Sequence, residues 1–444
     1  MTNPVNTREV ILDCLLAVTK EQAFLHIVMR DVLSKYAYLD KRDRSFISRV
    51  CHGTLERMPE VDGIINQFSK VPVRKMKPVI RLILRSALYQ MLYMDSVPNS
   101  AAVNEAVKLA TKKGFFGLKG FVNGVLRNID RNLDKITYPE RADFEEYMEK
   151  RYSILPWMTQ LWRTSMSDEK IEEIGKAFLT EGPTCVRVMV DRLDTATLKK
   201  RLEQQNITVS EHEKRPDVLY ISGYDSLGAI PEFVEGLFYV QDTSSMEVAT
   251  VIDPQAGEVG MDVCSAPGGK AIHAAMLMKE KENCVGNGNY GIVMARDISP
   301  KKVALIEENI ARTGMDNIVV SVQDAMELDV SMVEKADFVI ADLPCSGLGV
   351  LRKKPDIKYR TSLANVKELA LLQQEMLRVV CQYVKPGGRL LYSTCTINRL
   401  ENEDNVETFL KEHKEFTKKV QQQLLPKDGK QDGFFYCLLE KGAE

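Results

Sequence analysis

The chain has little cysteine, histidine or tryptophan for its length: nine Cys, five His and two Trp among 444 residues. The cysteines are scattered without a C-x-x-C pair, which argues against a zinc site and against a disulfide framework. We therefore predict reduced thiols and no metal. No run of about 18 apolar residues occurs, and the N-terminal MTNPVNTREV lacks the apolar segment of a secretion signal. These absences predict a cytoplasmic protein without a membrane partner.

Charge is distributed unevenly along a chain that has ample material for packed cores. Hydrophobic residues make up 44% of the chain and charged residues 27%. Residues 1–138 contain 22 Lys and Arg against 13 Asp and Glu, whereas the net charge of the whole chain is −2. A basic N-terminal part is typical of binding to a polyanion. A solvated helical surface would have the same charge, so charge alone leaves both interpretations open.

The spacing of apolar residues divides the chain into three predicted domains. Over 1–138 apolar residues recur at spacings of three and four, with Gly and Pro between the segments, which predicts an all-helical domain. Residues 139–236 begin with a charged connector and continue with a strand–helix–strand pattern, which predicts a small α+β domain. Over 237–444 apolar strands alternate with amphipathic helices, which predicts a doubly wound, mainly parallel α/β sheet.

The predicted strands of the last domain end in residues suited to a ligand. These strands are GMDVCS, GIVMARDI, NIVVSVQD, ADFVIADL and GRLLYST. In such a sheet, ligands bind beyond the carboxyl ends of the strands. The first strand runs into DVCSAPGGK (262–270), where Gly268 and Gly269 allow the backbone to approach a ligand closely. This segment is not G-x-G-x-x-G, so a dinucleotide is not the natural ligand.

Carboxylates follow the next three strands, at Asp297, Asp324 and Asp342. A single Asp at a strand end is usually a turn or cap residue. Three in register beside a small-residue loop instead suit S-adenosylmethionine, which offers ribose hydroxyls, an adenine amine and a cationic methionine end but no phosphate.

Two cysteines follow the fourth and fifth strands, Cys345 in DLPCSG and Cys395 in YSTCT. A lone Cys is more often a buried core thiol, but two thiols at one edge beside a methyl donor indicate covalent catalysis. Carbon 5 of cytosine cannot attack a methyl group unaided, whereas thiolate addition to carbon 6 creates an enamine that can. The adduct must then lose its carbon 5 proton to a base, and an acid on the pyrimidine nitrogen would stabilise it. Spacing alone does not decide which thiol attacks.

The segments DVCSAPGGK, ADLPCSG and YSTCT together resemble the RNA cytosine-5 methyltransferases, and nearly the whole chain resembles their RsmB/Sun/Fmu family, which acts on 16S ribosomal RNA. LRSALYQML, VPNSAAVNEAVKLA and KGFVNGVLRNI resemble the RNA-binding factor NusB. The resemblance implies a NusB-like RNA-binding domain at 1–138, a small α+β RNA-binding domain at 139–236 and a Rossmann-like class I methyltransferase domain at 237–444. It implies methyl transfer from S-adenosylmethionine to carbon 5 of a cytidine in 16S ribosomal RNA.

The resemblance also implies roles for single residues. Cys395 is the implied nucleophile, Cys345 the thiol needed for release, and Asp342 a further catalytic residue. DNA cytosine methyltransferases use the Pro-Cys thiol as nucleophile, so the reversed order is the main mechanistic alternative. The implied cofactor-binding residues are Cys264, Ser265, Ala266, Pro267, Gly268, Gly269, Lys270, Asp297, Asp324 and Asp342.

A basic segment, RKKPDIKYR (352–360), follows the fourth strand. Its Arg and Lys side chains could hold RNA phosphates, although a charge-rich surface loop would look similar. A target base must leave its stack to reach a buried thiol, so we expect single-stranded or loop RNA. We also expect the enzyme to be a monomer. The same reaction on transfer RNA or large-subunit RNA, and a non-catalytic RNA-binding or assembly factor, are the alternatives. The candidate RNA contacts are Arg352, Lys353, Lys354, Lys358 and Arg360.

Overall fold

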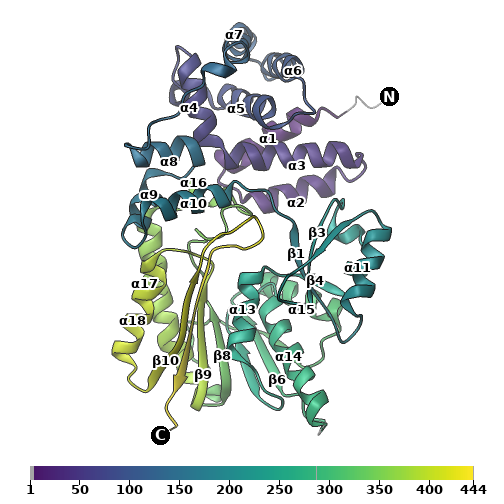
Figure 1. Ribbon diagram of the computed structural model, residues 1–444, viewed down its shortest axis with the longest axis vertical. Coiled ribbons are helices and arrows are strands. Elements are labelled where there is room, and N and C mark those ends of the chain that lie inside the picture. The colour runs from purple at the N-terminus through teal and green to yellow at the C-terminus, as the bar shows by residue number, and fades with distance from the viewer. Residues whose placement is uncertain (1–4, 287, 444) are drawn as a thin grey trace. The chain divides into compact units, whose positions relative to one another are not determined.

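The chain forms two compact units in a computed structural model that describes residues 5–286 and 288–443 (Figure 1). The first unit extends to Leu179 and also contains Leu351–Ser362. The second unit comprises Thr180–Val350 and the chain from Leu363 onward. The chain therefore leaves the second unit shortly after the fourth predicted strand, contributes twelve residues to the first, and returns.

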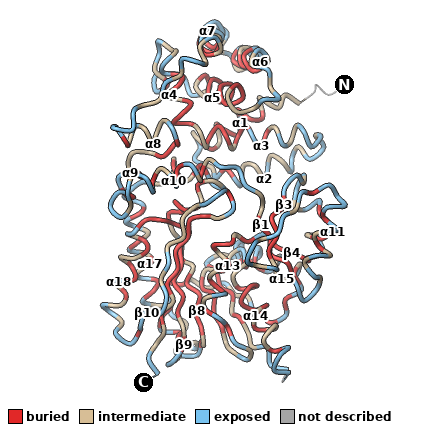
Figure 2. Tube along the Cα trace, in the orientation of Figure 1, coloured by how far each residue is buried: buried red, intermediate tan, exposed pale blue. Residues whose placement is uncertain are grey.

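The first unit is helical, as the apolar spacing predicts. Helix α5 lies at the centre of this unit (Figure 2). Every residue from Ile80 to Met91 except Arg81 is buried, so neighbouring helices cover it on all sides. Local signals set the helix starts: Asn6 and Asp40 cap α1 and α3 with their side chains, and Pro59 lies in the first turn of α4. The helices are α1 (Thr7–Thr19), α2 (Leu25–Lys35), α3 (Lys41–Glu56), α4 (Met58–Phe68), α5 (Pro78–Tyr93), α6 (Asn99–Lys112), α7 (Lys119–Asp130), α8 (Phe144–Tyr152), α9 (Pro156–Arg163) and α10 (Asp168–Phe178).

The inserted segment Leu351–Ser362 is anchored in this unit by buried polar contacts. It contains the short helix α16 (Ile357–Arg360). The Lys358 ammonium donates to the carbonyl oxygens of Glu56, at 2.7 Å, and Ser153, at 3.0 Å. The Tyr359 hydroxyl donates to the Leu55 carbonyl at 2.6 Å. These contacts satisfy carbonyls near the ends of α3 and α8, so the segment is an integral part of the helical unit.

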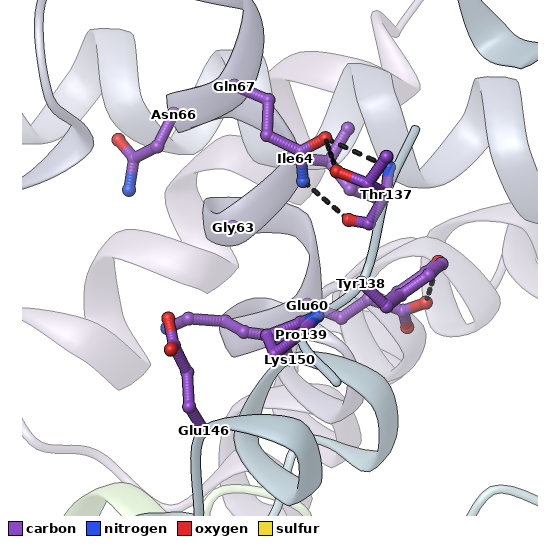
Figure 3. A pocket seen from close by; sticks show the side chains of 10 residues that line it. All are labelled: Glu60, Gly63, Ile64, Asn66, Gln67, Thr137, Tyr138, Pro139, Glu146 and Lys150. Atoms are coloured by element: carbon purple, nitrogen blue, oxygen red, sulfur yellow. Dashed lines mark hydrogen bonds between the residues drawn. The ribbon is translucent and has the colours of Figure 1, made fainter. Parts of the chain in front are cut away.

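A pocket of about 360 Å³ lies where the connector before α8 crosses α4 (Figure 3). The Gln67 side chain donates to the Thr137 carbonyl at 2.8 Å and accepts from the Thr137 amide at 3.1 Å. Next to it, the Tyr138 hydroxyl donates to buried Glu60 at 2.8 Å. These polar lining groups join the connector to the helices.

The second unit begins with a four-stranded antiparallel sheet in the order β2-β3-β1-β4. Helix α11 packs Leu198 and Leu202 into the same buried cluster as Val186 and Val188 of β1. This region has the strand–helix–strand content that the pattern predicts, and it begins at β1, whereas the residues before it as far as Leu179 belong to the first unit. Its elements are β1 (Thr184–Val188), α11 (Thr195–Gln204), β2 (Thr208–Glu211), β3 (Val218–Ser222), α12 (Pro231–Val234) and β4 (Phe238–Val240).

A seven-stranded sheet in the order β10-β11-β9-β8-β5-β6-β7 forms the rest of this unit. Strands β5 to β9 are parallel, which confirms the predicted doubly wound sheet, and the hairpin β10–β11 adds an antiparallel edge that the alternation did not predict. The strands are β5 (Val259–Asp262), β6 (Ile292–Asp297), β7 (Ile318–Val322), β8 (Ala336–Asp342), β9 (Val384–Thr394), β10 (Phe416–Leu424) and β11 (Phe434–Lys441).

Helices cover both faces of this sheet (Figure 1). Phe338 and Ile340 of β8 belong to the buried cluster under α13, α14 and α15, while Val339 and Ala341 face α17 and α18. Because both faces are buried here, the central strands β5 and β8 are largely apolar, and each ends in an aspartate. The helices are α13 (Thr243–Ile252), α14 (Gly269–Val285), α15 (Pro300–Thr313), α17 (Leu363–Val380) and α18 (Glu403–Glu412).

Candidate active site

The loop between β5 and α14 turns tightly at the carboxyl end of the sheet. It contains a cis peptide bond between Ala266 and Pro267, and Gly268 has a φ of 102°, a conformation that favours glycine. The Gly268 amide donates to the Ser265 carbonyl at 2.6 Å. A Cβ at Gly268 would lie 3.3 Å from Ile306, so the loop also packs closely on α15.

Asp297, at the end of β6, fixes this loop. One oxygen of its buried carboxylate accepts a hydrogen bond from the Ala266 amide at 3.0 Å, and the other accepts from the Ile298 amide at 2.8 Å. The Lys302 ammonium lies 3.1 Å from the same carboxylate. Asp297 therefore joins the first two strand ends of the site.

Asp324 lies just beyond the end of β7, and β7 is the strand that pairs with β6. Its half-buried carboxylate accepts a hydrogen bond from the Met326 amide at 2.9 Å, which closes a turn. The parallel pairing of Asp297 with Val322 places Asp324 at the same edge of the sheet.

Asp342, at the end of β8, pairs with Lys270 at the start of α14. The Lys270 Nζ lies 2.6 Å from Asp342 Oδ2, and the Ser393 hydroxyl donates to Asp342 Oδ1 at 2.8 Å. Burial alone would lower the pKa of Lys270, but the Asp342 carboxylate outweighs burial and raises that pKa above its ordinary value. Lys270 is therefore a fixed positive charge at the centre of the site.

Asp262, the last residue of β5, is a site residue that the sequence reasoning missed. It is fully buried, and neither carboxylate oxygen accepts a hydrogen bond from the described residues. Burial raises the pKa of Asp262 to about 7, against the opposing charge of Lys270. The one feature of the sequence that could have indicated it is its position, as an acidic residue just before the glycine-containing loop. An unsatisfied buried carboxylate suits a cationic ligand, so the residues present fit the methionine end of S-adenosylmethionine.

The two predicted thiols are brought together. Cys345 Sγ and Cys395 Sγ lie 3.1 Å apart, and both side chains are half-buried and free of disulfide bonds. Asp342 pairs with Ser393 across β8 and β9, which places the residues just beyond both strands side by side. The hydrogen bond to Cys395, followed by burial and by the charges of Glu401 and Asp342, raises the pKa of the Cys345 thiol well above its ordinary value.

Gly349 closes the loop that carries Cys345. Its amide donates to the Cys395 carbonyl at 3.0 Å, and its carbonyl accepts from the Gly433 amide at 2.8 Å. A Cβ at Gly349 would lie 2.1 Å from the Gly433 carbonyl oxygen, so a larger residue would displace the backbone. The loop is thus joined to the strand end that carries the second thiol.

The five basic residues proposed for RNA differ in exposure. Lys353 and Lys354 are exposed and Arg352 is half-buried. The Arg360 guanidinium lies over the Phe24 ring, 3.6 Å from its centroid, within the helical unit. Lys358 is 3% exposed with its ammonium held by carbonyls, so we leave it out of the proposed RNA contacts.

Two absences complete the description. Over residues 5–286 and 288–443, no group of His, Cys, Asp and Glu side chains is placed to hold a metal ion. In the same part of the chain, no helix has both the length and the apolar character needed to span a membrane.

The sheet, the loop after β5 and the polar strand ends define a Rossmann-like methyltransferase fold, and solved structures share it. PH0851 superposes with a TM-score of 0.79 at 24% identity and covers 99% of this chain and 100% of its own. NSun6 from Pyrococcus horikoshii, solved with SFG, gives a TM-score of 0.57 at 21% identity over 65% of this chain and 98% of its own. At these identities, the two structures support the fold.

Sequence comparison then identifies the family. Residues 249–440 match the model for "16S rRNA methyltransferase RsmB/F", and residues 5–131 match the NusB family. "Probable ribosomal RNA small subunit methyltransferase B" of Bacillus subtilis (strain 168) is 32% identical over 98% of this chain and 99% of its own. "Ribosomal RNA small subunit methyltransferase B" of Vibrio cholerae is 30% identical over 90% of both chains. The chain belongs to the ribosomal RNA small subunit methyltransferase B family.

Proposed function

We propose that the protein transfers a methyl group from S-adenosylmethionine to carbon 5 of a cytidine in 16S ribosomal RNA, through a covalent cysteine–cytosine adduct. The observation that carries this proposal is the 3.1 Å separation of Cys345 Sγ and Cys395 Sγ at the strand ends. The Lys270–Asp342 ion pair, at 2.6 Å, lies beside these strand ends. The family names of the relatives support small-subunit ribosomal RNA as the substrate.

The loop Cys264–Lys270, with Asp262, Asp297, Asp324 and Asp342, is the proposed cofactor site. When bound, S-adenosylmethionine supplies an electrophilic methyl group. The tight backbone turn at Gly268 would let a ligand lie close to the loop, and Asp297 and Asp324 offer acceptors for hydroxyl and amine groups. The buried charge of Asp262 would be satisfied by a cationic group.

Electrostatics favours Cys395 as the nucleophile. Burial lowers the pKa of Lys270, whereas Asp342 and, to a smaller extent, a thiolate at Cys395 raise it. Because this interaction is mutual, the Lys270 ammonium also stabilises a thiolate at Cys395. Cys345 instead faces Glu401 and Asp342, which help to keep it a neutral thiol. In the proposed reaction, Cys395 Sγ adds to carbon 6 and the enamine carbon 5 takes the methyl group. Cys345, once its own proton has passed to solvent, then removes the carbon 5 proton. The electron pair of that bond forms the carbon 5–carbon 6 double bond, and the carbon 6–sulfur bond breaks to release Cys395 as a thiolate.

Two further roles complete the proposal. Asp342, held by Lys270 and Ser393, would hydrogen-bond the pyrimidine edge and stabilise the adduct. Arg352, Lys353, Lys354 and Arg360 would contact RNA phosphates.

Bisulfite sequencing of ribosomal RNA from a deletion strain tests the target. The proposal predicts that one 16S cytidine loses protection from conversion and regains it when the gene is restored. An unchanged 16S profile with a lost signal in transfer RNA or 23S ribosomal RNA would move the same chemistry to another substrate. Purified protein that transfers no labelled methyl group to unmethylated RNA would support a non-catalytic factor instead.

A further inference from the structure

A fully buried carboxylate, Glu401, is hydrogen-bonded to the residue that follows Cys345. Glu401 ends a short 3-10 turn, Arg399–Glu401, which follows β9. Its Oε1 accepts hydrogen bonds from the Ser346 amide at 2.8 Å and the Gln373 side-chain amide at 3.0 Å. Its Oε2 accepts from the Ser346 hydroxyl and the Asn398 side-chain amide, both at 2.5 Å. Four donors therefore converge on one carboxylate in the interior.

These contacts reach the residues that follow both cysteines. Ser346 comes directly after Cys345, and Thr396 comes directly after Cys395. The hydroxyls of Ser346 and Thr396 lie 2.9 Å apart, and the Asn398 side chain donates to Thr396 Oγ1 at 2.9 Å. One carboxylate thus fixes the loop after β8 directly and the end of β9 through Asn398.

We propose that Glu401 is the positioning residue of the reaction: it holds the Cys345 loop and the Cys395 strand end in the register that brings the two thiols together. This proposal rests on the proposed function, since it assumes that both thiols act on one cytidine. Glu401 touches neither the proposed substrate nor the proposed cofactor residues. It acts through Ser346, Thr396 and Asn398, all of which are buried.

A carboxylate suits this position better than an amide does. Each Glu401 oxygen accepts two hydrogen bonds, and three of the four donors are N–H groups, which cannot become acceptors. A glutamine would place an NH2 group against at least one of them, leaving buried donors unsatisfied. The negative charge of Glu401 also helps to raise the pKa of the Cys345 thiol.

The same interior offers a matched control. The Tyr392 hydroxyl donates to Gln373 Oε1 at 3.0 Å and also to the Glu401 backbone carbonyl. Tyr392 is as buried as Glu401, but among the described residues its hydroxyl hydrogen-bonds to Gln373, Glu401 and Asn405, and not to Ser346, Thr396 or Asn398. Tyr392→Phe therefore removes buried hydrogen bonds from the same region while leaving the carboxylate and its link to the thiol loops in place.

The test compares full-length wild type, Glu401→Gln and Tyr392→Phe in single-turnover methyl transfer to unmethylated 16S RNA across a pH series. We expect Glu401→Gln to lower the rate at saturating RNA about a hundredfold, as a misplaced reacting group does, with unchanged affinity for S-adenosylmethionine and RNA. The limb of the pH profile that reports Cys345 should shift to lower pH in Glu401→Gln alone. Tyr392→Phe should retain the wild-type rate and profile.

Equal rates and equal pH profiles in the two variants would overturn the inference, and so would a loss confined to cofactor affinity. If Glu401→Gln does not fold, Thr396→Val decides, because it removes one hydroxyl from the network and keeps the shape of the side chain. We expect a slower rate with intact cofactor binding, and an unchanged rate would overturn the inference. Wild type without any methyl transfer or adduct would instead refute the proposed function.

Discussion

Lys270 and Asp342 form an ion pair across the carboxyl edge of the sheet, with Nζ and Oδ2 2.6 Å apart. The pair links the first turn of α14 to the end of β8, the strand that leads into Cys345. It also places a positive charge where it can stabilise a thiolate at Cys395. The ion pair therefore connects the proposed cofactor loop with the proposed nucleophile.

Lys270→Met should slow formation of the RNA adduct about a hundredfold, the effect of removing one preorganised electrostatic partner. The rate should also recover at higher pH, since the Cys395 thiolate loses its stabilising neighbour. Lys279→Met is the control, because Lys279 lies on the same helix but pairs with Asp316. Adduct formation would be followed over pH 6 to 9. A wild-type pH profile for Lys270→Met would contradict this role.

Asp262 should make cofactor binding depend on pH. Burial raises the pKa of its carboxyl to about 7, so below that pH a cationic ligand must displace a proton to pair with it. Affinity for S-adenosylmethionine should therefore rise with pH by up to about tenfold per unit below pH 7 and then level off. Calorimetric titrations at pH 6, 7 and 8 would show this dependence in wild type and its loss in Asp262→Asn. The same slope in both proteins would argue that Asp262 does not face the cofactor.

The stability of the chain should depend on pH through Lys358. Burial lowers the pKa of this amine to about 8 in the folded protein, whereas it is about 10.4 in an unfolded chain. Between these values the unfolded state binds the extra proton, so the free energy of unfolding rises with pH. From pH 8 to 9.5 wild type should gain about 2 kcal/mol relative to Lys358→Met. Urea unfolding of both proteins at pH 7, 8 and 9.5 would measure the gain, and parallel curves would refute it.

RNA binding should depend on the exposed pair Lys353 and Lys354. If both contact phosphates of single-stranded RNA, changing both to Gln should reduce the slope of log affinity against log salt by about 1.4. Changing Lys418 and Lys419 to Gln removes the same charge from an exposed part of β10 and should leave the slope unchanged. Filter binding between about 50 and 300 mM salt would measure this slope for both double variants. Equal slopes would place the RNA elsewhere.

The spacing of apolar residues predicted the architecture, because each strand and helix is encoded by a short stretch of the sequence. Apolar runs followed by helices gave β5 to β9, and parallel pairing of β8 with β9 then brings Cys345 opposite Cys395. The C-terminal hairpin was not predicted, because β10 is exposed along most of its length and has little apolar pattern. Strand order and strand ends could thus be inferred, but not the whole edge of the sheet.

The remaining site features depend on tertiary contacts that no local pattern encodes. Lys358 belongs to a basic run, and such runs are usually exposed, yet its ammonium is buried on two carbonyls from distant helices. Asp262 and Glu401 looked like ordinary acids in the sequence. Their importance becomes visible only in the folded structure. There the buried Asp262 carboxylate accepts no hydrogen bond from the described residues, whereas the Glu401 carboxylate accepts four.

The most direct test of the central claim is the covalent adduct. Each single variant, Cys345→Ala and Cys395→Ala, would be incubated with S-adenosylmethionine and unmethylated 16S RNA and resolved on a denaturing gel. The proposed roles predict that Cys345→Ala accumulates a protein–RNA adduct, that Cys395→Ala forms none, and that both still bind S-adenosylmethionine. An adduct with Cys395→Ala and none with Cys345→Ala would contradict the assignment of the two thiols.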